Sequence, residues 1–299
     1  MSKQILVIGS SNTDMTIKGD RLPLPGETVL GGDFTMGPGG KGANQAVAAQ
    51  RLGGDVTFVC KVGCDLFGDN AVSLYAKEGI DTSHILRSEK PSGVALILVD
   101  AKGENSISVA PGANGDISVE DIEALTPVIE ASDIVILQLE IPVPAVQKAV
   151  EIAHKAGKYV ILNPAPACEL PKEIFANISL ITPNQTEISL MTGCKVEDEE
   201  SLAKAVTEIQ RMGVRDVVVT LGSKGSLVCT DGTTTFVPSR KVKAVDTTAA
   251  GDTFCGGLAV GLSEGKTLVE AAAFATAASA LTVQKMGAQN SIPFRKDIQ

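Results

Sequence analysis

Short runs of apolar residues alternate with amphipathic stretches along most of the chain. Runs such as Ile-Val-Ile-Leu-Gln-Leu are almost continuously apolar, which is typical of strands covered on both faces of a sheet. They predict strands at residues 5–8, 56–62, 134–139, 158–162, 180–182 and 217–221. Helical periodicity predicts helices at residues 40–52, 67–78, 143–156 and 201–212. This alternation predicts an α/β fold with a mostly parallel central sheet flanked by helices.

Two regions, residues 16–36 and 93–110, interrupt the alternation. Both have the pattern of short strands and turns, and the second predicts a hairpin that turns across Ala101–Gly103. Neither region has a helix to cover it, so we expect these strands to form a small separate sheet that acts as a lid. No linker or internal repeat divides the sequence. Residues 1–299 are therefore expected to form a single domain from which the lid is an excursion.

Composition and charge exclude several classes of function. The chain has 35 Asp and Glu against 26 Lys and Arg, a net charge of −9, with 3% aromatic residues and no Trp. Nucleic acids and anionic membranes attract basic faces, so neither is expected as a partner. The six cysteines form no CxxC pair, which disfavours a structural zinc site. We see no secretory leader and no bilayer-spanning run, and we expect a cytoplasmic protein with reduced thiols.

A glycine-rich segment at residues 37–42, Gly-Pro-Gly-Gly-Lys-Gly, matches the GxGxxG pattern of dinucleotide sites. That fingerprint should follow the first strand directly, but the first strand here leads into Ser-Ser-Asn-Thr-Asp, so a nicotinamide cofactor is not expected. The P-loop pattern also fails, because Thr35 stands where its first glycine should be. What remains is a glycine pair before a helix, with Lys41 and Asn44 one turn apart. Such a junction either exposes backbone N–H groups to a ligand or is a tight turn into the helix.

A second segment, residues 246–254, reads Asp-Thr-Thr-Ala-Ala-Gly-Asp-Thr-Phe and precedes a helical pattern rich in small residues. The backbone N–H groups of Ala249, Ala250 and Gly251 would lie at the start of that helix, where its dipole favours an anion. Asp252 lies in the same turn. It is either a helix cap or a base that accepts a hydroxyl proton while the amides hold a phosphoryl group. The segment alone leaves both interpretations open.

Four motifs together resemble the signatures of one family. Gly-Gly-Lys-Gly-Ala-Asn-Gln-Ala at residues 39–46 and the segment at 246–254 are similar to the two signatures of the ribokinase-like sugar kinases, also called the PfkB carbohydrate kinases. Pro-Asn-Gln-Thr-Glu at residues 183–187 resembles the family's NxxE motif. Thr-Leu-Gly-Ser-Lys-Gly at residues 220–225 resembles its nucleotide-binding strand and turn. The resemblance covers essentially the whole chain.

Further phrases resemble the members of this family that act on ribose. They are Asn12-Thr13-Asp14 after the first strand and Gln138-Leu139-Glu140 at a later strand end. The resemblance implies a three-layer α/β domain whose β-sheet lid is used as a homodimer interface. It also implies ATP-dependent phosphorylation of D-ribose at the 5-hydroxyl. The alternatives are a sugar kinase acting on deoxyribose or fructose, and a sugar-binding relative without activity.

The resemblance also implies a role for each matching residue. Asp252 would be the general base on the 5-hydroxyl, and Ala249, Ala250 and Gly251 would form the anion hole. The sugar would contact Asn12, Asp14, Gly40, Lys41, Gly42, Asn44, Glu140 and Asp252. ATP would lie against Asn184, Thr220, Gly222, Ser223, Gly225, Gly251 and Thr276.

Two cations are implied as well. Glu187 would help to position Mg²⁺, through water. A potassium ion that activates the enzyme would lie beside the anion hole, at Asp246, Thr248, Thr282, Lys285, Gly287 and Ser291. One position departs from the family pattern, because ribokinase-like proteins often have a histidine against the adenine where this chain has Thr276. Threonine can form a hydrogen bond there but cannot stack on the base.

Overall fold

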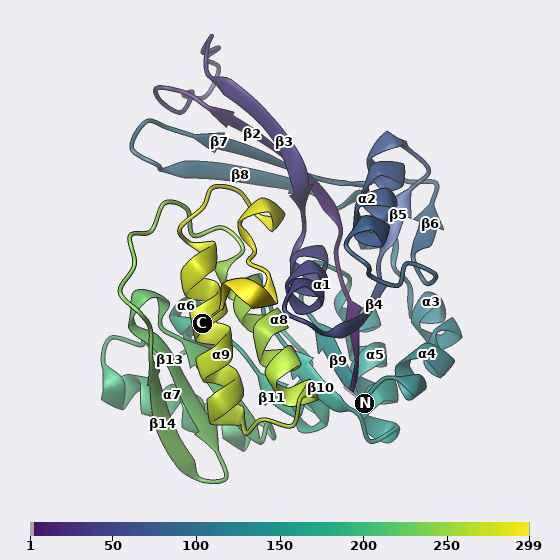
Figure 1. Ribbon diagram of the computed structural model, residues 1–299, viewed down its shortest axis with the longest axis vertical. Coiled ribbons are helices and arrows are strands. Elements are labelled where there is room, and N and C mark those ends of the chain that lie inside the picture. The colour runs from purple at the N-terminus through teal and green to yellow at the C-terminus, as the bar shows by residue number, and fades with distance from the viewer. Residues whose placement is uncertain (1–2, 299) are drawn as a thin grey trace.

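The computed structural model describes residues 3–298 and is built around an eight-stranded sheet (Figure 1). Along the sheet the strands follow the order β14-β13-β12-β11-β10-β9-β1-β4. The six strands from β12 to β4 are parallel, and β13 pairs antiparallel with both β12 and β14. Their bounds are β1 Gln4–Ile8, β4 Asp55–Val59, β9 Ile134–Leu137, β10 Tyr159–Leu162, β11 Leu180–Ile181, β12 Asp216–Thr220, β13 Gly225–Thr230 and β14 Thr233–Pro238. The predicted α/β fold with a mostly parallel sheet is confirmed.

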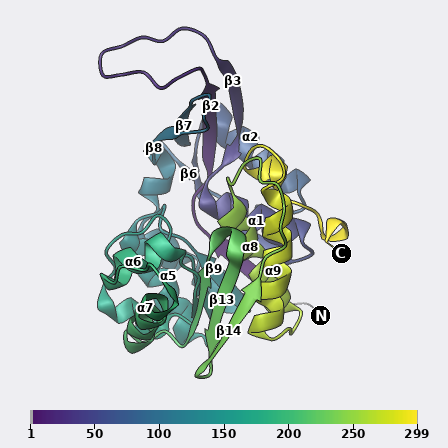
Figure 2. The same ribbon diagram turned by 90° about the vertical axis from the view of Figure 1, so that its left-hand side faces the viewer.

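Helices cover both faces of this sheet and make three layers (Figure 2). Alternate residues of one strand face opposite layers: Ile5 and Val7 of β1 pack into one core, and Leu6 and Ile8 into the other. The first core lies under α1 Lys41–Arg51, α2 Leu66–Lys77, α8 Ala250–Ser263 and α9 Leu268–Thr282. The second lies under α3 Val119–Ala124, α4 Thr126–Ala131, α5 Val143–Lys155, α6 Gln185–Thr192 and α7 Glu199–Arg211. Among the described residues, no helix is long and apolar enough to cross a membrane.

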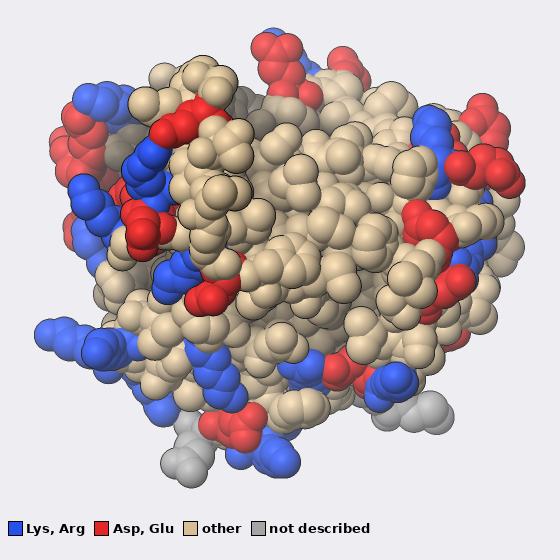
Figure 3. Space-filling view, turned by 90° about the horizontal axis from the view of Figure 1, so that it is seen from above, with Lys and Arg blue, Asp and Glu red and all other residues tan. Residues whose placement is uncertain are grey.

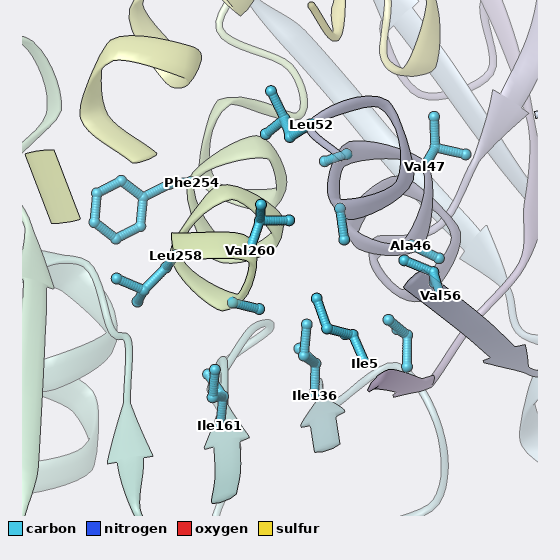
Figure 4. Close-up of a cluster of buried hydrophobic side chains, with 14 of the residues drawn as sticks. Ile5, Ala46, Val47, Leu52, Val56, Ile136, Ile161, Phe254, Leu258 and Val260 are labelled. Carbon is cyan, nitrogen blue, oxygen red and sulfur yellow. The ribbon is translucent and has the colours of Figure 1, made fainter. Parts of the chain in front are cut away.

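The helices α1 and α8 approach each other closely on the first face of the sheet (Figure 4). Small residues permit this approach. A Cβ added to Gly256 of α8 would lie 2.7 Å from Cβ of Ala48 and 2.8 Å from the backbone oxygen of Gln45, both on α1. Below the two helices, Ile5, Ile136 and Ile161 of the central strands belong to the same buried cluster. This contact fixes the start of α1 relative to the start of α8.

A separate four-stranded sheet, the small sheet, lies at the top of the view in Figure 1. Its order is β3-β2-β7-β8, and β7 and β8 form the predicted hairpin, with a hydrogen bond from the N–H of Gly103 to the backbone oxygen of Asp100. The expected small sheet is confirmed, although its first strand begins four residues earlier than residue 16. The bounds are β2 Asn12–Lys18, β3 Asp33–Gly39, β7 Gly93–Val99 and β8 Asn105–Ala110.

The structure corrects one predicted strand and adds several elements. The strand predicted at 56–62 is two strands, β4 and β5 Lys61–Gly63, because the chain leaves the central sheet at Cys60. There β5 pairs with β6 Leu86–Ser88, and the N–H of Leu86 donates to the backbone oxygen of Cys60 at 2.8 Å. The sequence also did not predict the β13–β14 hairpin or helices α3, α4 and α6. Short 3₁₀ helices occupy Gly112–Asp116, Lys172–Asn177, Gly222–Lys224, Gln289–Ser291 and Arg295–Asp297.

Candidate active site

The candidate site lies at the carboxyl edge of the parallel strands. Ser10 follows β1, Glu140 follows β9, Asn163 follows β10, Asn184 follows β11 and Thr220 ends β12. Since parallel strands end at one edge, residues far apart in the sequence are brought together there. The starts of α1 and α8 meet the same edge. The sequence motifs therefore converge because of the topology of the sheet.

A cavity of ≈ 210 Å³ opens at this edge and is called the active-site cavity below. It brings together residues from four of the sequence motifs. Most of the predicted contact residues lie outside its lining. Of the predicted sugar contacts these are Asn12, Asp14, Gly40, Gly42, Asn44 and Glu140, and of the predicted ATP contacts they are Gly222, Ser223, Gly225 and Thr276. The lining consists of Lys41, Asn163, Ala165, Thr182, Asn184, Glu187, Thr220, Thr247, Ala249, Ala250, Gly251, Asp252 and Cys255.

The start of α8 presents backbone N–H groups to this cavity. Ala249 is the N-cap residue and has a left-handed conformation, φ 59°, which is unusual for a residue with a Cβ. The N–H of Ala250 donates to Thr247 at 3.2 Å, whereas the N–H of Gly251 has no partner within residues 3–298. A Cβ added to Gly251 would meet no atom within 4 Å. This open, unpaired helix start is suited to an anion.

Asp252 is buried, with 6% of its surface exposed, and does not cap its helix. Its carboxylate instead accepts hydrogen bonds from two side chains of α1. Nδ2 of Asn44 lies 2.9 Å from Oδ2, and Nε2 of Gln45 lies 3.1 Å from Oδ1. The cap interpretation is therefore wrong. The carboxylate lies at the cavity, in the same turn as the unpaired amide of Gly251, whereas the predicted anion-hole amide of Ala250 is already bonded to Thr247.

Glu140 binds the start of α1. Its Oε2 accepts hydrogen bonds from the backbone N–H of Lys41 at 2.9 Å and from Oγ of Ser10 at 2.5 Å. The N–H groups of Gly42 and Ala43 also donate to Ser10. The glycine pair before α1 therefore does not leave these amides free for a ligand. The anion at this helix start is the chain's own carboxylate.

Asp14 and Asn12 extend from the start of β2. Oδ1 of Asn12 accepts a hydrogen bond from Nδ2 of Asn114 at 2.7 Å, which leaves the Asn12 amide N–H groups to face away from that partner. Gly40 has φ 90°, and a Cβ there would lie 2.8 Å from the backbone nitrogen of Asn12. A Cβ on Gly39 would overlap the carboxylate of Asp14. Glycine at both positions makes room for the polar groups of β2.

The acidic groups of the site interact with one another and with Lys41. Burial, with repulsion from Glu140 and Asp252, raises the pKa of Asp14 to about 6. Burial opposes the charge of Lys41, but the attraction of Asp252, Glu140 and Glu187 outweighs it and raises the lysine pKa. Lys41 therefore stays cationic among carboxylates.

Asn184 and Glu187 form a reciprocal cap at the start of α6. The N–H of Glu187 donates to Oδ1 of Asn184, and the N–H of Asn184 donates to Oε2 of Glu187, both at 2.8 Å. Burial raises the pKa of Glu187, against the lowering effects of the Asn184 hydrogen bond and of Lys41. Asn184 also pairs with Thr220 by a parallel bridge. The NxxE motif is thus both a helix cap and part of the cavity wall.

The turn after β12 contains two glycines with positive φ, Gly222 at 58° and Gly225 at 120°, with Ser223 between them. The N–H of Leu221 donates to the backbone oxygen of Gly225 at 2.8 Å and closes this turn. Thr276 lies on α9, is 7% exposed, and its Oγ1 has no hydrogen-bond partner among the described residues. The side chain at this position is therefore a buried hydroxyl, and it offers no ring that could stack on a base.

The residues predicted to hold potassium are only partly brought together. Oδ1 of Asp246 accepts from the N–H and Oγ1 of Thr248, and Oδ2 accepts from the N–H of Gly287 at 2.8 Å. Oγ1 of Thr282 instead donates to Thr253, 3.0 Å away on α8. The N–H of Lys285 donates to the backbone oxygen of Thr282. The hydroxyl of Ser291 donates to the backbone oxygen of Ala288. Within residues 3–298, no group of three or more His, Cys, Asp or Glu could hold a metal ion.

Sequence reasoning missed four polar residues that support the site. Gln45, Asn163 and Thr182 are buried beside Asp252 or its partners, and Asn114 holds Asn12. Asn163 and Thr182 follow or end predicted strands, a position that could have identified them. Gln45 follows Asn44 directly in a motif that was already singled out. Nothing in the local pattern around Asn114 indicated its contact with Asn12.

Comparisons with known proteins identify similar sequences and structures among carbohydrate kinases. The model of the pfkB family carbohydrate kinases matches residues 2–295. A ribokinase from Haemophilus influenzae is 44% identical over 298 residues, covering 99% of this chain and 97% of that protein. A deoxyribokinase from Salmonella typhi is 37% identical over 291 residues, covering 97% and 95%. The structure of Arabidopsis thaliana ribokinase complexed with ribose and ATP has a TM-score of 0.92 at 34% identity, covering 100% of this chain and 98% of that one.

The raised pKa of Asp14 predicts a pH-dependent change in stability. The folded protein favours the neutral form of the Asp14 carboxyl. The contribution of Asp14 to the free energy of unfolding is therefore fully present below the unfolded pKa of 3.8 and is lost as pH rises through about 6. Asp14→Asn should therefore raise the free energy of unfolding by up to about 3 kcal/mol above pH ~7 and change it little near pH ~4. Urea unfolding at the two pH values measures this, with the exposed Asp33→Asn as the charge control. A gain of equal size at both pH values would contradict the assignment.

Proposed function

The chain belongs to the pfkB family of carbohydrate kinases, and on that premise we propose that it transfers the γ-phosphoryl group of ATP to the 5-hydroxyl of D-ribose. The observation that carries the proposal is the geometry of the active-site cavity. Buried Asp252, the open start of α8 and cationic Lys41 line the same cavity as Asn184 and Thr220. A hydroxyl acceptor, a transferred phosphoryl group and a nucleotide require these three kinds of surface together.

In the proposed reaction, Asp252 accepts the proton of the sugar hydroxyl as its oxygen attacks the γ-phosphorus in line. The O–H bond of the sugar and the bond to the ADP oxygen break, and a new P–O bond forms. The amide of Gly251 and the dipole of α8 stabilise the charge on the transferred group. Lys41, which also lines the cavity, would add a positive charge. Closure of the small sheet would exclude water and so suppress hydrolysis of ATP.

The sugar would be held by carboxylates and amides. Asp14 and Glu140 can each accept hydrogen bonds from two neighbouring hydroxyls, and Asn12 can donate to a sugar oxygen since its own Oδ1 is occupied by Asn114. Oδ1 of Asn44 is buried without a partner, although Nδ2 of the same side chain binds Asp252. A buried carbonyl oxygen without a donor is costly, and a sugar hydroxyl would supply the donor.

ATP would enter from the side of α6 and β12, with its phosphates at Asn184 and the start of α8 and its adenosine against Gly222, Ser223, Gly225 and Thr276. The Mg²⁺ that accompanies ATP fits this donor set. Glu187 is the acidic residue on this side of the cavity, and Mg²⁺ usually takes one or two protein carboxylates, with phosphate and water as its other ligands. The metal would neutralise phosphate charge, and Glu187 would hold it through water.

A panel of acceptors tests the proposed substrate. Activity with ATP and Mg²⁺ is measured by ADP release on D-ribose, 2-deoxyribose, fructose and adenosine. Ribose should give the highest kcat/KM, because the contacts proposed for Asp14 and Glu140 would each use two neighbouring hydroxyls. The similar deoxyribokinase makes 2-deoxyribose the main competitor. A higher kcat/KM on 2-deoxyribose or fructose would overturn the ribose assignment but not the class of reaction, and no turnover of any sugar would support the non-catalytic alternative.

The role of Asp252 is tested separately. Asp252→Asn keeps the size of the side chain and its place beside Asn44 and Gln45, but it removes the proton acceptor. We expect kcat to fall by about 10²-fold or more. Steady-state kinetics on the preferred sugar measure the change, and near-normal turnover would show that another group accepts the proton.

We propose a potassium site beside the anion hole, around Asp246, Thr248 and Gly287. These residues are tied together by the Asp246 carboxylate, and this loop leads directly into Ala249. A cation there would stabilise the loop that leads to the unpaired amide of Gly251. Activity should rise when K⁺ is added to a Tris-buffered, sodium-free assay, and Asp246→Ala should abolish the rise. An identical rate with and without K⁺ would remove this proposal alone.

We propose that the small sheet also forms a homodimer interface. Uncharged side chains fill the centre of the view from above, and charged residues gather toward its rim (Figure 3). By strand register, Phe34, Met36, Ile17 and Leu96 share the face opposite to Asp14, and each is more than 40% exposed. An exposed apolar face of this kind favours association. Sedimentation should show a dimer that Phe34→Asp with Leu96→Asp converts to monomer, and a monomeric parent protein would contradict the proposal.

A further inference from the structure

Gln45 is a fully buried side chain that touches Asp252 but has no assigned role. It lies in the second turn of α1 and has 0% of its surface exposed. Its Nε2 lies 3.1 Å from Oδ1 of Asp252 and 3.0 Å from Oδ1 of Asn163. Its Oε1 accepts a hydrogen bond from Nε2 of Gln138 at 2.7 Å. Every hydrogen-bonding group of this amide is therefore used inside the protein.

The direction of this chain of amides is fixed at its far end. Nδ2 of Asn163 donates at 3.0 Å to the backbone oxygen of Thr182, which can only accept. Oδ1 of Asn163 must then face Gln45, so Gln45 must present its NH₂ group there. The same NH₂ group supplies the second hydrogen to Asp252. Rotation of any one amide by 180° would place oxygen against oxygen or nitrogen against nitrogen.

Gln138 shows that this orientation is maintained at a cost. Its Oε1 is buried without a hydrogen-bond partner and lies where a Cβ on Gly9 would be. The opposite orientation of Gln138 would bring its oxygen against Oε1 of Gln45. An unpartnered buried oxygen is unfavourable, so the orientation of Gln138 is set by Gln45 and, through it, by Asp252.

We propose that Gln45, held by Gln138 and Asn163, is the positioning residue of Asp252 in the proposed phosphoryl transfer. The proposal rests on the proposed function. Asn44 binds Oδ2 and Gln45 binds Oδ1, so the carboxylate is held at both oxygens and its plane cannot turn. A fixed carboxylate keeps its remaining lone pairs directed at the acceptor hydroxyl. Gln45 itself lies behind Asp252 and outside the lining of the active-site cavity.

Other groups around Asp252 do not supply the same restraint. Lys41 from the start of α1, Asp14 from β2, Glu187 from α6 and Cys255 from α8 interact with it electrostatically, but none forms a hydrogen bond to its carboxylate. Charge interactions of this kind vary slowly with angle, whereas hydrogen bonds are directional. The two amides of α1 therefore determine how the carboxylate is turned.

Gln45→Met tests the proposal, because methionine has a similar length and volume but no donor. We expect kcat to fall by about 10- to 100-fold, as for other small misplacements of a catalytic group. The KM values for sugar and ATP should stay within about two-fold of the parent, since Gln45 contacts neither. Gln50→Met is the matched control: the same substitution, on the same helix, on a side chain near Gly79 and away from the cavity. It should leave kcat unchanged.

A double-substitution cycle separates positioning from general support of the fold. In the Asp252→Ala background there is no carboxylate to hold, so adding Gln45→Met should lower the residual kcat by less than about two-fold. An equal loss in both backgrounds, a loss expressed in KM, or an unchanged kcat in Gln45→Met would each overturn the proposal.

A further variant covers the case in which Gln45→Met does not fold. Gln138→Met breaks the chain one link further away, and it should lower kcat by a smaller factor, again only when Asp252 is present. The same loss with and without the carboxylate would contradict the proposal. Failure of the proposed function itself looks different, because the parent protein would then show no sugar-dependent ATP turnover, or Asp252→Asn would remain active.

Discussion

The packing of α1 on α8 is the contact on which the site depends. Asn44 and Gln45 come from one helix and Asp252 from the other, and their hydrogen bonds are possible only because Gly256 and Ala48 let the helix axes approach. These two segments are more than two hundred residues apart in the chain. The central sheet brings their starts to one edge, and the small residues bring them within hydrogen-bond reach. The same helix contact therefore packs apolar surface and places the polar groups of the site.

An acidic protein can form a cavity that suits an anion because the relevant electrostatics are local. The net charge of −9 is spread over a surface screened by solvent, whereas the cavity contains helix amides and Lys41 at short range. The carboxylates beside the cavity stabilise the positive charge of Lys41 but disfavour one another's negative charge. They keep Lys41 charged and, together with the larger effect of burial, raise the pKa of Asp14. In the proposed function, the sugar and the phosphates would therefore be bound by groups of opposite charge that lie side by side.

The fold could largely be predicted from the sequence because parallel strands buried on both faces are almost continuously apolar, as in residues 134–137. The strand predicted at 56–62 was wrong in extent, since an apolar pattern persists through Cys60 while the chain changes sheets. The hairpin of β13 and β14 was missed because its threonines resemble a loop. Strand pairing, and not composition, decides both cases.

The site could be predicted where a motif is contiguous and only in part where contacts join distant segments. Residues 249–252 form a helix start, which local sequence signals well. In contrast, no local pattern shows that Glu140 occupies the start of α1, that Asn114 binds Asn12, or that Gln138 orients Gln45. The interpretation of 39–46 as a segment with exposed amides therefore needs correction, because the N–H groups of Lys41, Gly42 and Ala43 are already hydrogen-bonded within the protein.

The place of Asp14 on β2 gives the small sheet the geometry of a lever. Asn12 is fixed at the root of the strand by Asn114, Asp14 is two residues further along, and Lys18 is at the far end. At about 3.3 Å per residue, a rotation about Asn12 moves Lys18 roughly three times as far as Asp14. A ligand that drew Asp14 toward Glu140 would therefore act on the short arm. A small displacement of Asp14 would then become a wide displacement at the tip of the sheet.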